Sequence, residues 1–230
     1  MYVILLSGGL DSALNLAIAA KEKKARLAIT IRYGQRAAEA ECAAAKKLCE
    51  HYGVEWKHIN LEWLGEVNPT ALTRSEQKMP HLHTDELDQM NKASASMKAV
   101  WVANRNGVFL NVAAAYAEAL GVSHVVAGFN KEEASTFPDN SVEFMEALEK
   151  SFSFSTQNHV RMESFTKDMQ KTEILARALA IELPLNYVWS CYERGPDRCW
   201  KCESCKRTER ALLANGSPGK EWLARIGWKQ

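Results

Sequence analysis

A glycine-containing segment near the N-terminus has residue types that suit the binding of a phosphate group. It reads Leu-Ser-Gly-Gly-Leu-Asp-Ser over residues 6–12 and follows a short apolar run, as expected where a buried strand meets a helix. Amide groups at the start of that helix would face an anion, and the helix dipole favours negative charge there. Gly8 and Gly9 let the main chain approach a pyrophosphate, and Ser7 and Ser12 can donate hydroxyl hydrogens. The segment therefore predicts a pyrophosphate-binding loop.

Two common nucleotide-binding loops do not match this segment. No lysine follows the glycines at the place that a Walker loop requires, and the third glycine of a dinucleotide-binding fingerprint is missing. Asp11 could cap the helix or hold Mg²⁺ through a water molecule.

Four cysteines near the C-terminus form the second group of residues that could do chemistry. They are Cys191, Cys199, Cys202 and Cys205. Four thiolates are enough to close a tetrahedral structural zinc site, and the two-residue gaps let a tight turn present successive sulfurs to one ion. An iron–sulfur cluster could use the same spacing. We expect structural Zn²⁺ and a tail that folds when it binds.

The elements that must position these residues alternate between apolar runs and helical patterns. Such alternation is typical of βαβ units, and hence of a parallel sheet covered by helices on both faces. We expect strands at residues 2–6, 27–31, 54–61 and 122–127, and helices at residues 13–23, 36–52, 106–120, 141–151 and 167–183.

One stretch breaks this rhythm. Residues 62–96 contain two prolines and a polar run with little periodicity, which indicates either a surface loop or a loop that orders over a ligand. The regular pattern ends near Pro184. We therefore expect an ATP-binding α/β domain over residues 1–186 and a zinc-binding segment, packed on it, over residues 187–230.

Composition excludes several classes of protein. The 230 residues are 47% hydrophobic and 25% charged with a net charge of +1, so the chain is neither disordered nor globally basic as a nucleic-acid-binding protein would be. We find no basic leader and no apolar stretch of the ~20 residues that a membrane span needs. The sequence predicts a cytoplasmic protein with no membrane association.

The motifs together resemble a known family. Ser-Gly-Gly-Leu-Asp-Ser at residues 7–12 resembles the PP-loop of ATP pyrophosphatases, which have a Rossmann-like, adenine nucleotide alpha hydrolase fold. Over nearly its full length the chain resembles the 7-cyano-7-deazaguanine synthase family of the queuosine pathway. The motifs that carry this resemblance are Tyr33-Gly34-Gln35-Arg36, Arg105-Asn106, Gly128-x-Asn130, Pro138-Asp139, Lys171-x-Glu173-Ile174 and Trp189-Ser190-Cys191-Tyr192.

The resemblance implies an activity and a set of partners. Members of the family convert 7-carboxy-7-deazaguanine to the nitrile through an acyl adenylate, using ATP and ammonia, and are generally homodimers. The residues that the resemblance assigns to ATP are Leu6, Ser7, Gly8, Gly9, Leu10, Asp11, Ser12 and Arg36. Those assigned to catalysis are Asp11, Ser12, Arg105 and Lys171, and those assigned to the deazaguanine are Asn130, Ser135, Phe137 and Asp139.

Each basic residue could instead be a structural ion-pair partner. Asp139 could accept hydrogen bonds from the guanine-like edge or cap the helix that starts near Ser141. Residues 133–141 depart from the family's pattern, and Ala134 and Ser141 replace a tyrosine and an arginine, which should enlarge or neutralise part of the pocket. Trp200 replaces a glycine, so we expect the turn there to avoid a conformation that only glycine adopts.

These departures leave two alternatives open. One is a ligase of the same family that attaches the activated acyl group to a protein or nucleic-acid amine, as in anti-phage defence. The other, from a different class, is a non-catalytic protein that senses nucleotides. Erosion of the loop would favour the latter, but the loop is intact.

Overall fold

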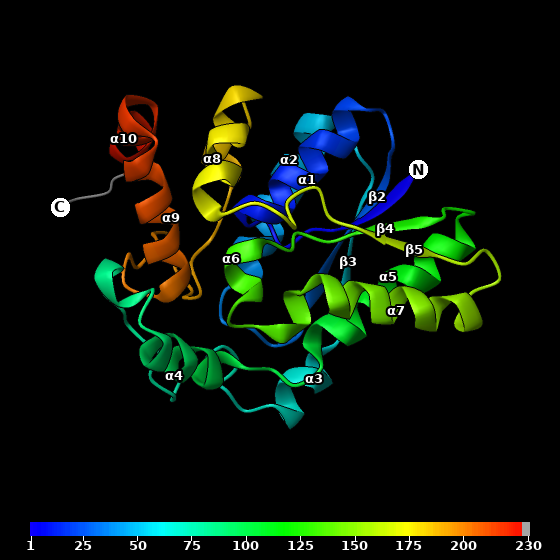
Figure 1. Ribbon diagram of the computed structural model, residues 1–230, viewed down its shortest axis with the longest axis horizontal. Coiled ribbons are helices and arrows are strands. Elements are labelled where there is room, and N and C mark those ends of the chain that lie inside the picture. The colour runs from blue at the N-terminus through cyan, green and yellow to red at the C-terminus, as the bar shows by residue number, and fades with distance from the viewer. Residues whose placement is uncertain (227–230) are drawn as a thin grey trace.

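The central sheet has five parallel strands. The computed structural model describes residues 1–226, and in it the strand order is β3-β2-β1-β4-β5, with every neighbouring pair parallel (Figure 1). The four expected strands are confirmed. The strands are β1 (Tyr2–Leu5), β2 (Ala25–Arg32), β3 (Trp56–Asn60), β4 (His124–Val126) and β5 (Arg161–Glu163), of which the last was not expected.

Helices cover both faces of the sheet, as parallel strands require. On one face lie α1 (Leu10–Lys21), α2 (Ala38–Tyr52) and α8 (Lys171–Ala180); on the other lie α5 (Arg105–Ala119) and α7 (Val142–Ser155) (Figure 1). Val3 and Ile4 are both fully buried, and they belong to the two different core clusters. Successive residues of β1 therefore pack against opposite helical layers. The expected α/β fold is confirmed.

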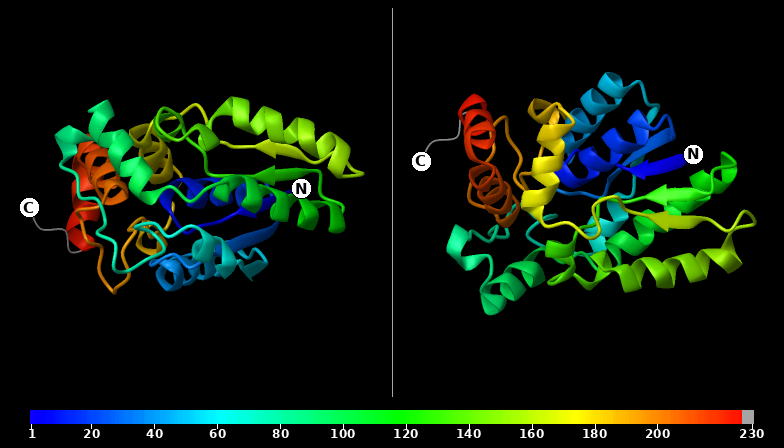
Figure 2. Two further views of the ribbon diagram at one scale, coloured as in Figure 1. Left: turned by 90° about the horizontal axis from the view of Figure 1, so that it is seen from below. Right: turned by 45° about the horizontal axis from the view of Figure 1, so that its top comes forward.

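The segment expected to be a loop contains three helical pieces, so that expectation was wrong for them. They are α3 (Glu62–Val67), the 3₁₀ helix η1 (Thr84–Glu86) and α4 (Met90–Val100), which lies at the side of the molecule near the C-terminal helices (Figure 2). The buried residues of α4 are Ala93, Ser96 and Val100. Because two of these three are small, the buried face carries little of the apolar periodicity that identifies a helix in sequence.

The C-terminal segment adds two helices beside α8. They are α9 (Glu203–Ala214) and α10 (Gly216–Arg225) (Figure 2). Leu212 and Leu223 join the core cluster of β1, α1 and α8. The tail therefore shares the main core, and a domain boundary after residue 186 stays a prediction; residues 227–230 of the expected segment lie outside the described residues. Three short elements complete the structure: α6 (Lys131–Ala134), η2 (Pro138–Asn140) and η3 (Leu185–Tyr187). No helix among residues 1–226 is long and apolar enough to span a membrane.

Candidate functional site

The loop between β1 and α1 packs tightly against α2. Gly8 has a φ of +80°, and a Cβ atom there would lie 2.8 Å from the Cβ of Ala44 and 2.9 Å from the carbonyl oxygen of Glu41. Only glycine fits such a position. No side-chain hydrogen bond caps α1 at Gly9, so within the described chain the first amide groups of this helix are left to an external anion.

Two hydroxyl groups are held inside this loop. The Oγ atoms of Ser7 and Ser12 lie 3.1 Å apart, and Ser12 donates to the carbonyl oxygen of Gly9 at 3.1 Å. The Gly9 amide donates to Ser7 Oγ at 3.3 Å. Ser12 is buried, with 6% of its surface exposed. The loop is therefore ordered by its own hydrogen bonds before any ligand arrives.

The loop forms part of the wall of a cavity of about 240 Å³. Residues that follow β1, β2 and β4 meet there, at the carboxyl ends of the strands, where open α/β sheets bind their ligands. The charged and amide side chains that line the cavity are Asp11, Gln35, Glu41, Arg105, Asn106, Glu133, Asn140 and Lys171; aromatic rings come from Tyr33, Phe109, Phe129, Phe137, Trp189 and Tyr192.

One ammonium group stands beside the loop. Lys171, the first residue of α8, is buried and donates from Nζ to Asp11 Oδ2 and, at 3.1 Å, to Glu133 Oε1. Burial raises the pKa of Asp11 to about 6, although the Lys171 ammonium works in the opposite direction. The second carboxylate oxygen of Asp11 is buried without a hydrogen-bond partner among the described residues. A single cation thus compensates two carboxylates at the edge of the cavity.

A guanidinium group approaches the cavity from the other helical layer. Arg105, at the start of α5, donates to the hydroxyl oxygen of Tyr33 at 3.2 Å, and its guanidinium carbon lies 5.7 Å from the centre of the same ring. Burial raises the pKa of Tyr33, so the hydroxyl stays protonated and accepts from Arg105. Arg105 and Lys171 therefore bring positive charge to the cavity from two sides.

Most of the residues that the sequence assigned to ATP, to catalysis or to the deazaguanine meet in this cavity. They are Leu6, Ser7, Gly9, Leu10, Asp11, Ser12, Arg105, Phe137 and Lys171. Arg36 does not line it: its guanidinium is buried and donates to Glu193 at 3.0 Å and to the carbonyl oxygens of Arg74 and Gln77. Gly8 lies behind the loop. A contact between Arg36 and ATP stays a prediction, and it would require Arg36 to give up its present hydrogen bonds.

Three residues predicted to hold the deazaguanine are engaged in local structure. Asn130 caps α6 by accepting the Glu133 amide at 2.8 Å, and Ser135 donates to the carbonyl oxygen of Glu132 at 2.7 Å. Asp139 lies in η2, where its Oδ1 accepts from Asn140 at 3.3 Å. None of the three lines the cavity.

The substrate segment also corrects two expectations. Ser141, not Asp139, caps α7, because its Oγ accepts the Phe144 amide at 3.1 Å. Neither Ala134 nor Ser141 lines the cavity, so these two departures from the family's pattern do not enlarge it directly.

Glu41 and Glu133 also line the cavity, and the sequence did not assign either of them a role. Glu133 follows the Gly128-x-Asn130 motif by three residues, and Glu41 follows Tyr33-Gly34-Gln35-Arg36 by five. A carboxylate a few residues after a motif is only a weak sequence signal for a site residue, and the fold is needed to show that it lines the cavity.

The four cysteines predicted to hold a metal come together. Their sulfur atoms all lie within 4.8 Å of one another, and the described chain pairs none of them in a disulfide. Backbone amides point at two of the sulfurs: the Cys199 amide donates to Cys191 Sγ and the Cys202 amide to Cys199 Sγ, both at 3.3 Å. Amides around sulfur atoms suit thiolate ligands, so the donor set fits a tetrahedral metal site.

The turn at Trp200 is left-handed. Its φ of +54° lies in a region that non-glycine residues seldom adopt but that is not restricted to glycine. The amides of Lys201 and Cys202 both reach Cys199 Sγ, at 3.5 and 3.3 Å, which requires the chain to reverse at Trp200. The left-handed conformation provides that reversal, and the partly buried indole packs against the core.

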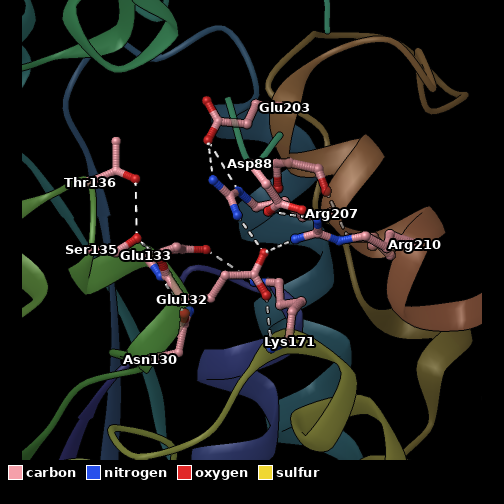
Figure 3. Close-up of polar contacts among 12 residues, drawn as sticks. Asp88, Asn130, Glu132, Glu133, Ser135, Thr136, Lys171, Glu203, Arg207 and Arg210 are labelled. Carbon is pink, nitrogen blue, oxygen red and sulfur yellow. Dashed lines mark hydrogen bonds and ion pairs between the residues drawn. The ribbon is translucent and has the colours of Figure 1, made fainter. Parts of the chain in front are cut away.

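A buried ionic network connects the cysteine segment to α6 (Figure 3). The guanidinium of Arg207 donates to Glu203 at 2.8 Å and also to Glu132, which accepts from Arg210 at 2.7 Å and from the Lys171 amide at 3.1 Å. Glu203 in turn accepts from Ser96 of α4 at 2.6 Å. Helix α9 is thereby attached to the residues next to Lys171.

Comparison with known proteins assigns the family. Residues 1–216 match the family model described as "Queuosine biosynthesis protein QueC". The chain is 48% identical over 213 residues to the 7-cyano-7-deazaguanine synthase of Methanosarcina mazei, covering 91% of this chain and 92% of the relative. It is 49% identical over 214 residues to that of Desulforamulus reducens, covering 93% and 94%. With both the model and the relatives spanning most of its length, the chain belongs to the QueC family.

Proposed function

We propose that this protein converts 7-carboxy-7-deazaguanine to 7-cyano-7-deazaguanine with ATP and ammonia. The observation that carries the proposal is membership of the QueC family together with an intact phosphate loop that lines a cavity. The relatives named above are 7-cyano-7-deazaguanine synthases.

The chemistry proceeds in two activations. A carboxylate oxygen of the substrate attacks the α-phosphorus of ATP, which releases pyrophosphate and leaves an acyl adenylate. Ammonia displaces AMP and gives the amide. The amide oxygen is then adenylated by a second ATP, and loss of AMP with that oxygen and of the nitrogen-bound protons gives the nitrile. Each adenylation develops negative charge on the departing pyrophosphate, which positive groups must stabilise.

The proposed roles follow from where the side chains lie. The amides at the start of α1 and the hydroxyls of Ser7 and Ser12 bind the phosphates. Lys171 exchanges part of its contact with Asp11 and Glu133 for a phosphate oxygen, and Arg105 binds the substrate carboxylate or the α-phosphate. Phe137 lines the cavity and offers a ring for stacking.

Two metal ions belong to this proposal. Zn²⁺ would be held by Cys191, Cys199, Cys202 and Cys205 as a structural ion, because four clustered sulfurs leave no open coordination position. Mg²⁺ would accompany the ATP phosphates. The unpartnered oxygen of Asp11 suits a contact with the water shell of that ion, as the sequence predicted. Whether the protein is a homodimer, as the resemblance implies, stays a prediction.

The test is incubation of the purified protein with ATP, 7-carboxy-7-deazaguanine and excess ammonium, followed by mass spectrometry and pyrophosphate measurement. We expect the nitrile, with two pyrophosphates released per nitrile formed. A product that stops at the amide, or an acyl mass that appears only on an added protein or nucleic-acid acceptor, would contradict the proposal in favour of the ligase. Absence of pyrophosphate release with every acceptor would favour the nucleotide sensor.

A further inference from the structure

Three carboxylate side chains line the cavity, and one of them stands apart. Asp11 and Glu133 are both ion-paired with Lys171. Glu41, on the first turn of α2, forms no ion pair in the described chain; the single hydrogen bond of its carboxylate there is from Gln35 Nε2 to Oε2, at 2.8 Å. Its other oxygen is available to a ligand in the cavity.

The position of the Glu41 carboxylate is fixed by Gln35. The Gln35 side chain is buried, and its amide oxygen accepts the Tyr33 amide at 2.8 Å. Its amide nitrogen donates to the Ile31 carbonyl oxygen at 3.1 Å as well as to Glu41. All of these partners lie at or after the end of β2, so Gln35 holds the carboxylate against that end of the sheet. A side chain so fully engaged acts as a rigid support for an acceptor.

The electrostatics decide which end of a ligand Glu41 can face. Burial raises the pKa of Glu41, while the Gln35 amide and the Arg105 guanidinium lower it. A carboxylate repels phosphate, so the phosphates belong beside Lys171 and the start of α1. Glu41 must face a part of the ligand that donates hydrogen bonds.

The surfaces beside Glu41 suit a flat ring. Ile29 and Ile31 of β2 line the same cavity, and so does the ring of Tyr33. An aromatic heterocycle with an amino group satisfies both features, because its faces are apolar and its edge donates hydrogen bonds.

We propose that Glu41, supported by Gln35, is a specificity-determining residue that accepts a hydrogen bond from the amino group of a purine-type ring. The inference rests on the proposed function, which brings two such rings to the cavity. These are the adenine of ATP, with a 6-amino group, and the deazaguanine, with a 2-amino group. Both present the same chemistry to a carboxylate, and the experiment below distinguishes them.

The variant Glu41→Gln tests this role, because it keeps the shape and removes the charge. Glu39→Gln is the matched control: Glu39 lies two residues away on α2, has 81% of its side chain exposed and pairs with Arg32. For each protein, kcat/KM is measured with ATP and with inosine triphosphate, which carries oxygen in place of the 6-amino group. A second pair is 7-carboxy-7-deazaguanine and its analogue without the 2-amino group.

We expect one of the two preference ratios to fall at least about tenfold in Glu41→Gln, as for loss of a hydrogen bond to a charged group. A fall in the ATP ratio identifies adenine as the ring, and a fall in the other identifies the deazaguanine. Glu39→Gln should keep both ratios. A general loss of activity lowers kcat/KM for both members of a pair and so leaves the preference ratio unchanged. If Glu41→Gln folds poorly, Glu41→Asp is measured instead; it keeps the charge but shortens the reach, and its preference ratio should fall by less.

The inference would be overturned if Glu41→Gln folds and both of its preference ratios stay within about threefold of those of the unmodified protein. If the unmodified protein does not turn over the acid, the proposed function fails, but the role of Glu41 can still be measured. The same comparisons are then made as equilibrium affinities for ATP, inosine triphosphate and the two deazapurine acids. Equal affinities for each pair in the unmodified protein would exclude a role for Glu41 in reading an amino group.

Discussion

Replacement of Lys171 by methionine would separate the structural and chemical roles of its ammonium group. The change leaves Asp11 and Glu133 without their shared cation. Removing one partner of a buried ion pair costs about 3–5 kcal/mol. The Glu133 side chain is 29% exposed and can regain water, so we expect the lower end, about 3 kcal/mol. For a chain of this size the midpoint of thermal unfolding should fall by about 6–12 °C.

The loss of stability in Lys171→Met should depend on pH, and the ionisation of Asp11 determines whether it grows or shrinks. Its pKa in the folded protein is about 6, above the ordinary value of 3.8, and removal of the ammonium that lowers it raises it further. A carboxyl group whose pKa is raised by folding destabilises the fold where it is ionised, and this penalty declines as the pH falls from the pKa in the folded protein toward the pKa in the unfolded chain. The difference in unfolding free energy between Lys171→Met and the unmodified protein should therefore shrink from about pH 8 to about pH 5.

A triple variant with Asp11→Asn, Lys171→Met and Glu133→Gln provides the decisive comparison. It buries no uncompensated charge, so it should regain most of the lost thermal stability. Its adenylation rate should stay at least about tenfold below that of the unmodified protein, because no ammonium faces the phosphates. Lys167→Met is the control, since Lys167 lies near the start of α8 but is only partly buried, with 38% of its side chain exposed, and is loosely paired with Glu163, at 3.9 Å. A triple variant with full activity, or Lys171→Met with unchanged melting and turnover, would refute the reasoning.

Three further predictions concern the loop and the cysteines. Purified protein should contain about one zinc per chain by elemental analysis, and Cys202→Ser should lose it; iron in the unmodified protein would contradict this. Ser12→Ala should lower pyrophosphate release at least about tenfold while the melting midpoint stays within a few degrees, and retained activity would argue against a phosphate contact. A Cβ at residue 128 would lie 2.6 Å from the Ser12 amide nitrogen, so Gly128→Ala should displace the loop and weaken ATP binding in a calorimetric titration. The control Gly9→Ala has more room, 3.3 Å to Ser7 Oγ, and should bind ATP more tightly than Gly128→Ala.

The sequence predicted the sheet well because its strands are buried on both faces. Runs such as residues 2–6 are continuously apolar and end at turn residues, a signal that few other structures produce. The strand β5 escaped notice because it has three residues, of which only Met162 is buried. Helix α4 escaped because its buried face includes Ala93 and Ser96. In both cases tertiary packing fixes an element that its own residues specify weakly.

The part of the candidate site that the sequence predicted best is the phosphate loop, whose role depends on its backbone conformation. The loop needs glycine at residue 8 for steric reasons, and the sequence displays that need directly. Side chains that bind across the fold are harder to predict, because Asn130 and Ser135 satisfy hydrogen bonds of their own helix ends. Glu41 shows the converse. It is brought to the cavity by three contacts of Gln35 that no spacing rule contains.

The short helix α6 explains how the cysteine segment and the phosphate loop can depend on each other. Its neighbouring residues Glu132 and Glu133 accept from different side chains: Glu132 from the guanidinium of Arg207, and Glu133 from the ammonium of Lys171. Arg207 lies on α9, whose first turns also carry Cys205. Loss of the metal would free the start of α9, and with it the support for α6. A reduced turnover in Cys202→Ser would then arise without any change in the residues that touch ATP. The unmodified protein stripped of zinc by a chelator should show the same loss, and restoring zinc to it should restore both the fold of the tail and the rate.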